Sequence, residues 1–200
     1  MAQFVNLNPG SLRELHVGNE RLVSYNVEMT EVTGGTFWKA YTPAQIAGTE
    51  PFVLKGGFLG NATASTDLMQ YYDPIALSDK KLRKLAKEIG PAWVRVSGTW
   101  STKTYYDFDG HTNGVVPEGY NAILTREQWL GVLDFCKDIG AKLLISVADC
   151  EGLHHADEPW NPSQAEQIFA LSKEYGKAID AAEFVNEPNL LAMSGCPKGY

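Results

Sequence analysis

Carboxylate, amide and aromatic side chains come directly after four short apolar segments of this chain. The four polar stretches are Asn26-Val27-Glu28, residues 95–100, Asp149-Cys150-Glu151 and Asn186-Glu187-Pro188-Asn189. A carboxyl group can exchange protons with a bound ligand, while a neighbouring amide holds a ligand hydroxyl. The face of an aromatic ring such as Trp100 can pack against an apolar surface of the same ligand. The pattern predicts a polar site assembled from several segment ends.

Histidine and cysteine residues do not predict a metal or cofactor site. His154-His155, with Asp157 and Glu158 nearby, does not have the His-x-x-x-His spacing of a helix-borne zinc site, so a loop bordering the polar site is expected there. The cysteines are too few and too widely spaced for a zinc site or a disulfide scaffold: Cys136, Cys150 and Cys196. No Gly-x-Gly-x-x-Gly follows a predicted strand. We therefore expect no metal and no cofactor.

Helical and strand-like periodicity alternates along the second half of the chain. The helices and strands that it predicts must position the polar groups at the segment ends. Amphipathic helices are predicted over residues 79–89, 125–139 and 162–178. Ser78 is the predicted N-cap of the first helix, and Thr125 with Gln128 forms a capping box for the second. Apolar strands are predicted over about residues 22–29, 92–97, 142–148 and 182–187. Three successive helix–strand pairs indicate a parallel α/β fold.

Four such strands predict the N-terminal half of a (β/α)8 TIM barrel over residues 21–200, because a closed barrel needs eight. The alternative is a doubly wound open sheet, which the absence of a glycine fingerprint disfavours. Residues 1–20 do not fit a barrel unit. Residues 4–7 and 12–17 look like two short strands joined by a Pro9-Gly10 turn, and we assign them to a β-sandwich accessory domain. Residues 30–74 are expected to form a long loop or irregular hairpins.

Composition excludes several classes of partner. The formal net charge of −7 offers no basic surface for nucleic acid, and no segment approaches the roughly 18 apolar residues that span a bilayer. No signal peptide is visible in residues 1–20, which leaves a cytoplasmic protein or a removed signal as alternatives. A neutral or small ligand is the expected partner.

The tripeptide Asn186-Glu187-Pro188, placed after a fourth apolar strand, resembles the acid/base signature of clan A, the large clan of retaining (β/α)8 glycoside hydrolases. In that clan the Glu protonates the leaving oxygen and then deprotonates water, and the preceding Asn hydrogen-bonds the sugar 2-hydroxyl. The resemblance makes Glu187 the catalytic acid/base and Asn186 a substrate-binding residue. The alternative is an ordinary polar turn, since Pro and Asn are turn residues.

A narrower resemblance covers the first two strands. Residues 85–99 (LAKEIGPAWVRVSGT) are similar to the second strand of the heparanase and β-glucuronidase family, with Ser97 in place of the first glycine of a Gly-Gly-Thr stretch. Residues 23–28 (VSYNVE) are similar to the family's first strand, whose terminal acid lines the substrate cleft. By this match Glu28 binds sugar. The alternative is a solvent-facing carboxylate. The family also favours a secreted, periplasmic or lysosomal location.

Other residues at the strand ends complete the predicted site. Arg95 lies within an apolar strand, so its charge is expected to pair with a carboxylate. Glu28 and Glu187 are the candidates, and a purely structural acid is an equal alternative. Thr99 and Trp100 are expected to line the cleft. Asp149 could hydrogen-bond sugar hydroxyls, although a capped or solvated loop position is the favoured alternative.

A retaining glycosidase needs a second carboxylate about 5–5.5 Å from the first. The clan places this nucleophile on the seventh strand, so we expect the C-terminal half of the barrel to supply it, in the same precursor or as a second chain. The resemblance implies hydrolysis of β-linked uronic acid glycosides, with a glucuronide or glycosaminoglycan-like polysaccharide as substrate. The alternatives are a carbohydrate-binding or scaffold half-barrel without turnover, and a clan-related β-glycosidase for another sugar.

Overall fold

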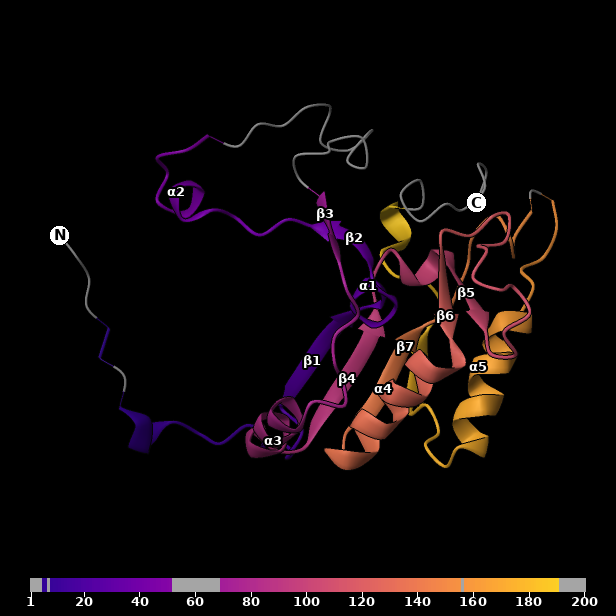
Figure 1. Cartoon of the computed structure of the whole chain (residues 1–200). Coiled ribbons are helices and arrows are strands. Elements are labelled where there is room, and N and C mark those ends of the chain that lie inside the picture. The colour runs from indigo at the N-terminus through magenta and orange to yellow at the C-terminus, as the bar shows by residue number, and fades with distance from the viewer. Residues whose placement is uncertain (1–4, 7, 52–68, 156, 191–200) are drawn as a thin grey trace.

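The computed structural model describes residues 5–6, 8–51, 69–155 and 157–190 as a mixed α/β fold built on a parallel sheet (Figure 1). Four parallel strands follow one another across this sheet in chain order: β1 (Val23–Glu28), β4 (Ala92–Ser97), β7 (Lys142–Ser146) and β8 (Ala181–Glu183). The predicted strands are confirmed, with β8 ending four residues earlier than expected. Glu187 therefore lies on the segment that follows β8.

Helices connect these strands as the sequence predicts. They are α3 (Lys80–Ile89), α4 (Arg126–Asp138) and α5 (Ser163–Glu174). The capping box of α4 is confirmed, because Thr125 Oγ1 accepts from the Gln128 amide at 3.2 Å and the Gln128 side chain accepts from the Thr125 amide at 2.9 Å. The predicted N-cap of α3 is wrong by one residue. Asp79, not Ser78, accepts from the Leu82 amide at 2.7 Å.

The two faces of the sheet differ in polarity. One face packs against the helices, and its strand residues belong to a single buried apolar cluster with Ala86, Trp129 and Ile168: Val94, Val96, Leu143 and Ile145. Burial of such side chains is the main source of stability, at about 1.5–3 kcal/mol each. Side chains alternate along a strand, so Arg95, Ser97 and Ser146 point to the opposite face. That face carries the candidate site.

Short elements, including a separate two-stranded sheet, lie beyond the carboxyl ends of β1 and β4. Helix α1 (Met29–Thr33) follows β1 directly, and β2 (Gly35–Trp38) pairs with β3 (Met69–Tyr72) as an antiparallel hairpin; these lie beyond the arrowheads of β1 and β4 in Figure 1. The antiparallel pair agrees in part with the prediction of a long loop or irregular hairpins in residues 30–74, but short helices at residues 30–33 and 43–46 were not predicted, and residues 52–68 lie outside the described ranges. The remaining short elements are η1 (Pro9–Ser11), α2 (Pro43–Ile46), η3 (Ser101–Lys103) and η4 (Pro188–Leu190).

Strands β5 (Thr104–Asp107) and β6 (Ala122–Thr125) form a parallel pair that the sequence did not predict. Both strands are only four residues long, so neither carries enough alternation to be recognised. The pair lies between β4 and α4 in the chain and buries Tyr106 and Leu124.

The N-terminal strand prediction is wrong for the described residues. Residues 12–17 contain no strand, and the predicted Pro9-Gly10 turn is the 3-10 helix η1, capped by the Asn8 side chain. Of the other predicted strand, Val5 and Asn6 are not in a strand, and Phe4 and Leu7 lie outside the described residues. A strand needs a hydrogen-bonding partner, and no described segment pairs with residues 12–17. Their membership of a β-sandwich stays a prediction.

Within the described ranges, no helix is both long and apolar enough to cross a membrane. Cys136 and Cys150 are buried, and Cys196 lies outside the described residues.

Candidate active site

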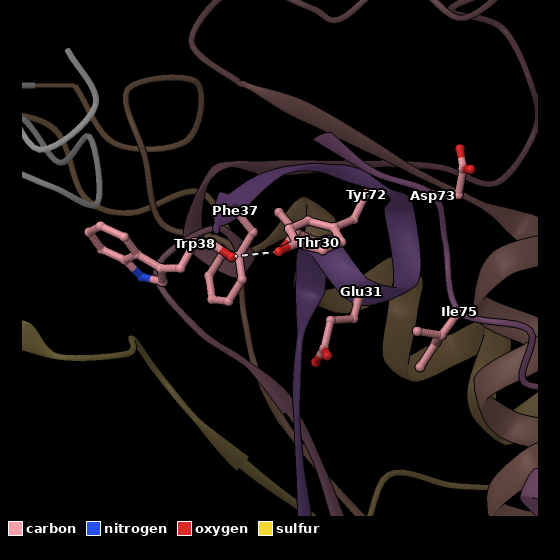
Figure 2. Close-up of a pocket in the computed structure, with 7 residues that line it drawn as sticks. All are labelled: Thr30, Glu31, Phe37, Trp38, Tyr72, Asp73 and Ile75. Atoms are coloured by element: carbon pink, nitrogen blue, oxygen red, sulfur yellow. Dashed lines mark hydrogen bonds between the residues drawn. The ribbon is translucent and has the colours of Figure 1, made fainter. Parts of the chain in front are cut away.

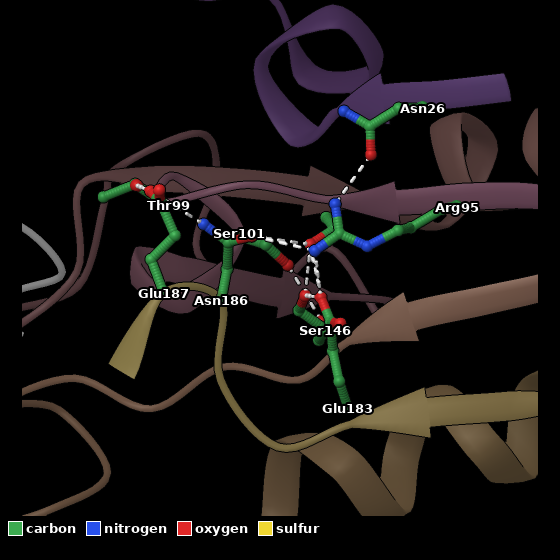
Figure 3. Close-up of polar contacts among 9 residues, drawn as sticks. Asn26, Arg95, Thr99, Ser101, Ser146, Glu183, Asn186 and Glu187 are labelled. Atoms are coloured by element: carbon green, nitrogen blue, oxygen red, sulfur yellow. Dashed lines mark hydrogen bonds and ion pairs between the residues drawn. The ribbon is translucent and has the colours of Figure 1, made fainter. Parts of the chain in front are cut away.

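Six polar side chains from all four strands of the main sheet, and from the segment after β8, form one hydrogen-bonded group that we call the inner polar cluster (Figure 3): Asn26, Arg95, Ser97, Ser146, Glu183 and Asn186. The parallel register explains their meeting. Asn26 is paired with Arg95, and Ser146 with Glu183, so each pair shares a sheet face. The cluster is therefore specified by strand register.

Arg95 lies at the centre of the inner polar cluster. Its guanidinium donates to Asn26 Oδ1 at 2.6 Å, to Asn186 Oδ1 at 2.8 Å and to the Glu183 carboxylate. The predicted pairing with Glu28 or Glu187 is therefore wrong, and Arg95 pairs with Glu183 instead. Sequence reasoning missed Glu183, which stands in the middle of a predicted apolar strand. A partly buried Arg on one strand needs an acid on the same face of another strand. A search for such an acid among the predicted strands could have identified Glu183.

Glu183 is held in its ionised form by its neighbours. Burial alone would raise the pKa of Glu183, but hydrogen bonds from Ser146, Ser97 and Arg95, together with the Arg95 charge, lower this pKa below its ordinary value. The Ser97 hydroxyl donates at 2.7 Å. Glu183 is consequently an anchoring anion, and its proton is not available for transfer near neutral pH.

Asn186 connects the inner polar cluster to Glu187. Arg95 donates to its amide oxygen at 2.8 Å, which fixes the orientation of the amide group, and the Ser97 hydroxyl oxygen lies 3.3 Å from the same atom. The amide nitrogen is consequently turned toward Glu187 and lies 3.4 Å from Glu187 Oε2. Asn186 thus presents N–H groups beside the carboxylate, as a residue that binds a ligand hydroxyl must.

Glu187 is exposed at the carboxyl-terminal side of β8, immediately before η4. Its backbone has φ 50°, in the left-handed region that a residue with a side chain adopts at a cost of about 1–3 kcal/mol. Thr99 Oγ1, at the corresponding end of β4, lies 3.5 Å from Glu187 Oε2. The carboxylate is therefore open to a ligand while Thr99 and Asn186 border it.

Glu28, the last residue of β1, has a half-buried carboxylate whose Oε2 accepts no hydrogen bond from the described residues. It packs directly on Gly98, where an added Cβ would fall 1.5 Å from Oε2 and where φ is +96°. Burial, together with the negative charges of Glu31 and Glu187, raises the pKa of Glu28 to about 7 despite the opposing effect of Arg95. The predicted site residues Glu28 and Glu187 are thus close enough to influence each other.

The raised pKa of Glu28 predicts a pH-dependent stability. Because the folded-state pKa of about 7 exceeds the ordinary value of 4.5, the native state binds more protons than the unfolded state between these pH values. Stability is consequently full below about pH 4.5 and falls as the pH rises through 7, by about 1–2 kcal/mol after allowance for solvent screening. The difference in urea midpoint between wild type and Glu28→Gln, measured from pH 5 to 8, checks this.

The wild-type midpoint should decline relative to that of Glu28→Gln over this pH range. Glu174→Gln, an exposed carboxylate at the end of α5, is the matched control and should follow the wild-type curve. Parallel curves for wild type and Glu28→Gln would contradict a raised pKa at Glu28.

Trp100 and Asp149, also predicted at the site, have different surroundings. Trp100 is half-buried, and its ring meets Phe37 edge-on with centroids 5.1 Å apart. Asp149 is fully buried and its Oδ1 lies 3.2 Å from His154 Nδ1. Because the Asp149 side chain is fully buried, the alternative of a solvated loop position is wrong. Its predicted contact with sugar stays a prediction.

A pocket of about 250 Å³ lies next to the end of β1 (Figure 2). It is lined by residues of α1, the β2–β3 hairpin and the segment after β3: Thr30, Glu31, Phe37, Trp38, Tyr72, Asp73 and Ile75. Tyr72 donates to the Trp38 carbonyl at 2.8 Å and joins the two strands of the hairpin. Glu31 also accepts from the Glu28 backbone at 2.8 Å, so the pocket borders the Glu28 side of the candidate site.

The structure therefore brings Glu28, Thr99, Asn186 and Glu187 to one edge of the sheet, with Trp100 directly after Thr99. An exposed carboxylate beside an oriented amide and a hydroxyl can exchange protons with a polyhydroxy ligand. Comparison with protein families and with curated proteins found no match to this chain.

Proposed function

We propose that residues 21–200 are the N-terminal half of a (β/α)8 barrel. The strands of the main sheet follow chain order without the reversal that marks a doubly wound sheet, which supports a barrel over the open-sheet alternative. Helices cover one face and polar residues occupy the other, as expected for the outside and inside of a barrel. In the described part of the chain, β1 and β8 each pair on one side only, so further strands would close the sheet.

The proposed activity of the completed barrel is that of a retaining glycoside hydrolase. The observation that carries it is Glu187 itself: an exposed carboxylate just beyond the fourth parallel strand, beside an Asn186 amide that Arg95 holds in place. Glu187 would protonate the glycosidic oxygen as it leaves and then remove a proton from the incoming water. Asn186 would donate to the sugar 2-hydroxyl.

The proposed substrates are β-linked uronic acid glycosides, including glucuronides and glycosaminoglycan-like polysaccharides. Glu28, Thr99 and Trp100 would contact the sugar from the ends of β1 and β4. Glu28, with its raised pKa, would donate a hydrogen bond in its protonated form below about pH 7. The attacking carboxylate would come from the C-terminal half of the barrel, at about 5–5.5 Å from Glu187.

Turnover of a panel of aryl β-glycosides tests this function. The protein, produced together with the segment that completes the barrel, should hydrolyse the β-glucuronide faster than the β-xyloside, α-arabinoside and β-glucoside. Proton NMR of the first product should show the β-anomer, because double displacement retains configuration. An α-anomer would rule out double displacement. Fastest cleavage of another glycoside would rule out uronic acid specificity, and sugar binding without any turnover would favour a carbohydrate-binding protein.

A further inference from the structure

Three potential metal ligands meet at the end of β5 and on the loop that follows it, in a place to which the proposed activity assigns no role. Asp107, Asp109 and His111 alternate along the chain, and one ligand atom from each lies within 4.8 Å of the other two. His111 Nδ1 is 3.4 Å from Asp107 Oδ1 and is in hydrogen-bond contact with Asp109 Oδ1. All three side chains therefore converge on one point.

Asp107 supplies an independent indication of a ligand. Only 5% of the Asp107 side chain is exposed. Its Oδ1 accepts no hydrogen bond from any described residue. The other oxygen, Oδ2, is engaged by Thr112, whose hydroxyl donates at 2.6 Å and whose amide donates at 3.3 Å. A buried carboxylate oxygen without a donor is unfavourable, and a cation at the point of convergence would satisfy it.

The surroundings of His111 suit a metal ligand. Its Nε2 lies 3.2 Å from the Tyr105 hydroxyl, so Nε2–H can donate to Tyr105 when a metal ion displaces the Nδ1 proton that contacts Asp109, and Nδ1 is then free to bind the ion. The Tyr105 ring also meets the imidazole edge-on, at a centroid distance of 5.8 Å. A partner on the second ring nitrogen is the usual way in which a protein orients a metal-binding histidine.

We infer that Asp107, Asp109 and His111 bind a divalent first-row transition cation, with Zn²⁺ as the reference ion. Two carboxylates balance the charge of the ion, and an imidazole nitrogen in the set favours Zn²⁺ over the oxygen-seeking Ca²⁺ and Mg²⁺. The ion would fasten the loop after β5 to the end of that strand, which is a structural role. This site revises the expectation, based on the spacing of His and Cys residues, that the chain holds no metal.

A protonated His111 bridging the two carboxylates is the competing explanation of the same geometry. In that case the imidazolium supplies the positive charge and a metal ion has no place to bind. The two explanations differ in a direct measurement of metal affinity, which needs no enzymatic assay and is therefore independent of the proposed glycosidase activity.

Calorimetric titration of the metal-free chain with Zn²⁺ tests the site. Wild type should bind one Zn²⁺, and His111→Ala should lose at least about 10-fold in affinity. His111 is more than half exposed, so its substitution should leave the fold intact, which circular dichroism verifies. Asp107→Asn should lose affinity similarly. His155→Ala, an exposed histidine outside the cluster, is the matched control and should bind as wild type does.

Two outcomes would overturn the inference. The first is a wild-type chain that does not bind Zn²⁺, or whose affinity is the same in His111→Ala, because the site would then be a salt bridge or the ion would bind elsewhere. The second is tighter binding of Ca²⁺ than of Zn²⁺ with no effect of His111→Ala, because the ligand set would then be oxygen alone. The visible absorption of bound Co²⁺ provides a second readout, since loss of the imidazole nitrogen in His111→Ala should change its spectrum.

Discussion

Glu187→Gln should lower kcat/KM for an alkyl β-glucuronide by about 10²–10⁴-fold, the usual contribution of a positioned acid or base. An alkoxide is a poor leaving group, so in the proposed reaction it would depend on a proton from Glu187. A dinitrophenolate is a stable anion and leaves without that proton, so kcat/KM for the dinitrophenyl β-glucuronide should fall by less than about 10-fold. The dependence of the loss on the leaving group distinguishes an acid/base residue from one that only binds sugar.

Azide should partly restore turnover of the dinitrophenyl substrate by Glu187→Gln. The second step requires a base to deprotonate water, and the variant lacks it, whereas azide is already an anion. The product would be a β-glucuronosyl azide, which NMR identifies. Glu174→Gln, at the end of α5 that leads into β8, is the matched control and should leave both substrates unaffected. Equal losses for both leaving groups would contradict the acid/base role.

Long elements with strong periodicity could be predicted from the sequence. Strand β4 has the predicted bounds, and the Thr125–Gln128 capping box fixes the start of α4. Both are local features, because an apolar run and a cap motif each act within a few residues. The order and direction of the four main strands followed from three helix–strand alternations, for the same reason.

Features that depend on distant partners could not be predicted. Residues 12–17 have an apolar content typical of a strand, yet no described segment offers them hydrogen bonds. Strands β5 and β6 show the converse, since each is too short to be recognised alone and forms because the other lies beside it. Where strand propensity is weak, pairing with a neighbouring segment therefore decides whether a strand forms.

The residues of the candidate site also fall into those that local sequence reveals and those that depend on distant partners. Asn186 and Glu187 stand out because they end the apolar run predicted as the fourth strand, a signal contained in three residues. The role of Glu183 depends on Arg95, which is 88 residues away in the chain and reaches it only through the sheet. The requirement for glycine at position 98 also depends on a distant residue, because the Glu28 carboxylate packs on it and leaves no room for a side chain.

Arg95→Met should lower the free energy of unfolding by about 2–3 kcal/mol. Removing one partner of a buried ion pair costs about 3–5 kcal/mol because the other charge is left uncompensated, and the 29% and 33% exposure of these side chains reduces that cost. Glu183 would be the uncompensated charge. Urea unfolding near pH 7, where the Glu183 carboxylate is ionised, measures the effect.

A double-mutant cycle separates the ion pair from simple loss of packing. Arg95→Met with Glu183→Met removes both charges, and the double variant should be more stable than the sum of the single losses predicts, by about 1–3 kcal/mol. Lys84→Met is the matched control, because its pair with Glu88 is exposed and spans one helical turn at 3.8 Å. That substitution should cost less than about 0.5 kcal/mol. Additive losses in the cycle would show that Arg95 and Glu183 do not depend on each other.

The same substitution tests whether the inner polar cluster positions the site. Without Arg95, the Asn186 amide loses its shortest hydrogen bond and can rotate away from Glu187. A displaced amide weakens a contact to the sugar 2-hydroxyl that strengthens in the transition state, so kcat should fall while KM changes little. Arg95→Lys keeps the charge on Glu183 but lacks the fork that reaches Asn26, Glu183 and Asn186 together. It should therefore restore most of the stability and little of kcat, whereas equal recovery of both would mean that Arg95 acts only through the stability of the fold.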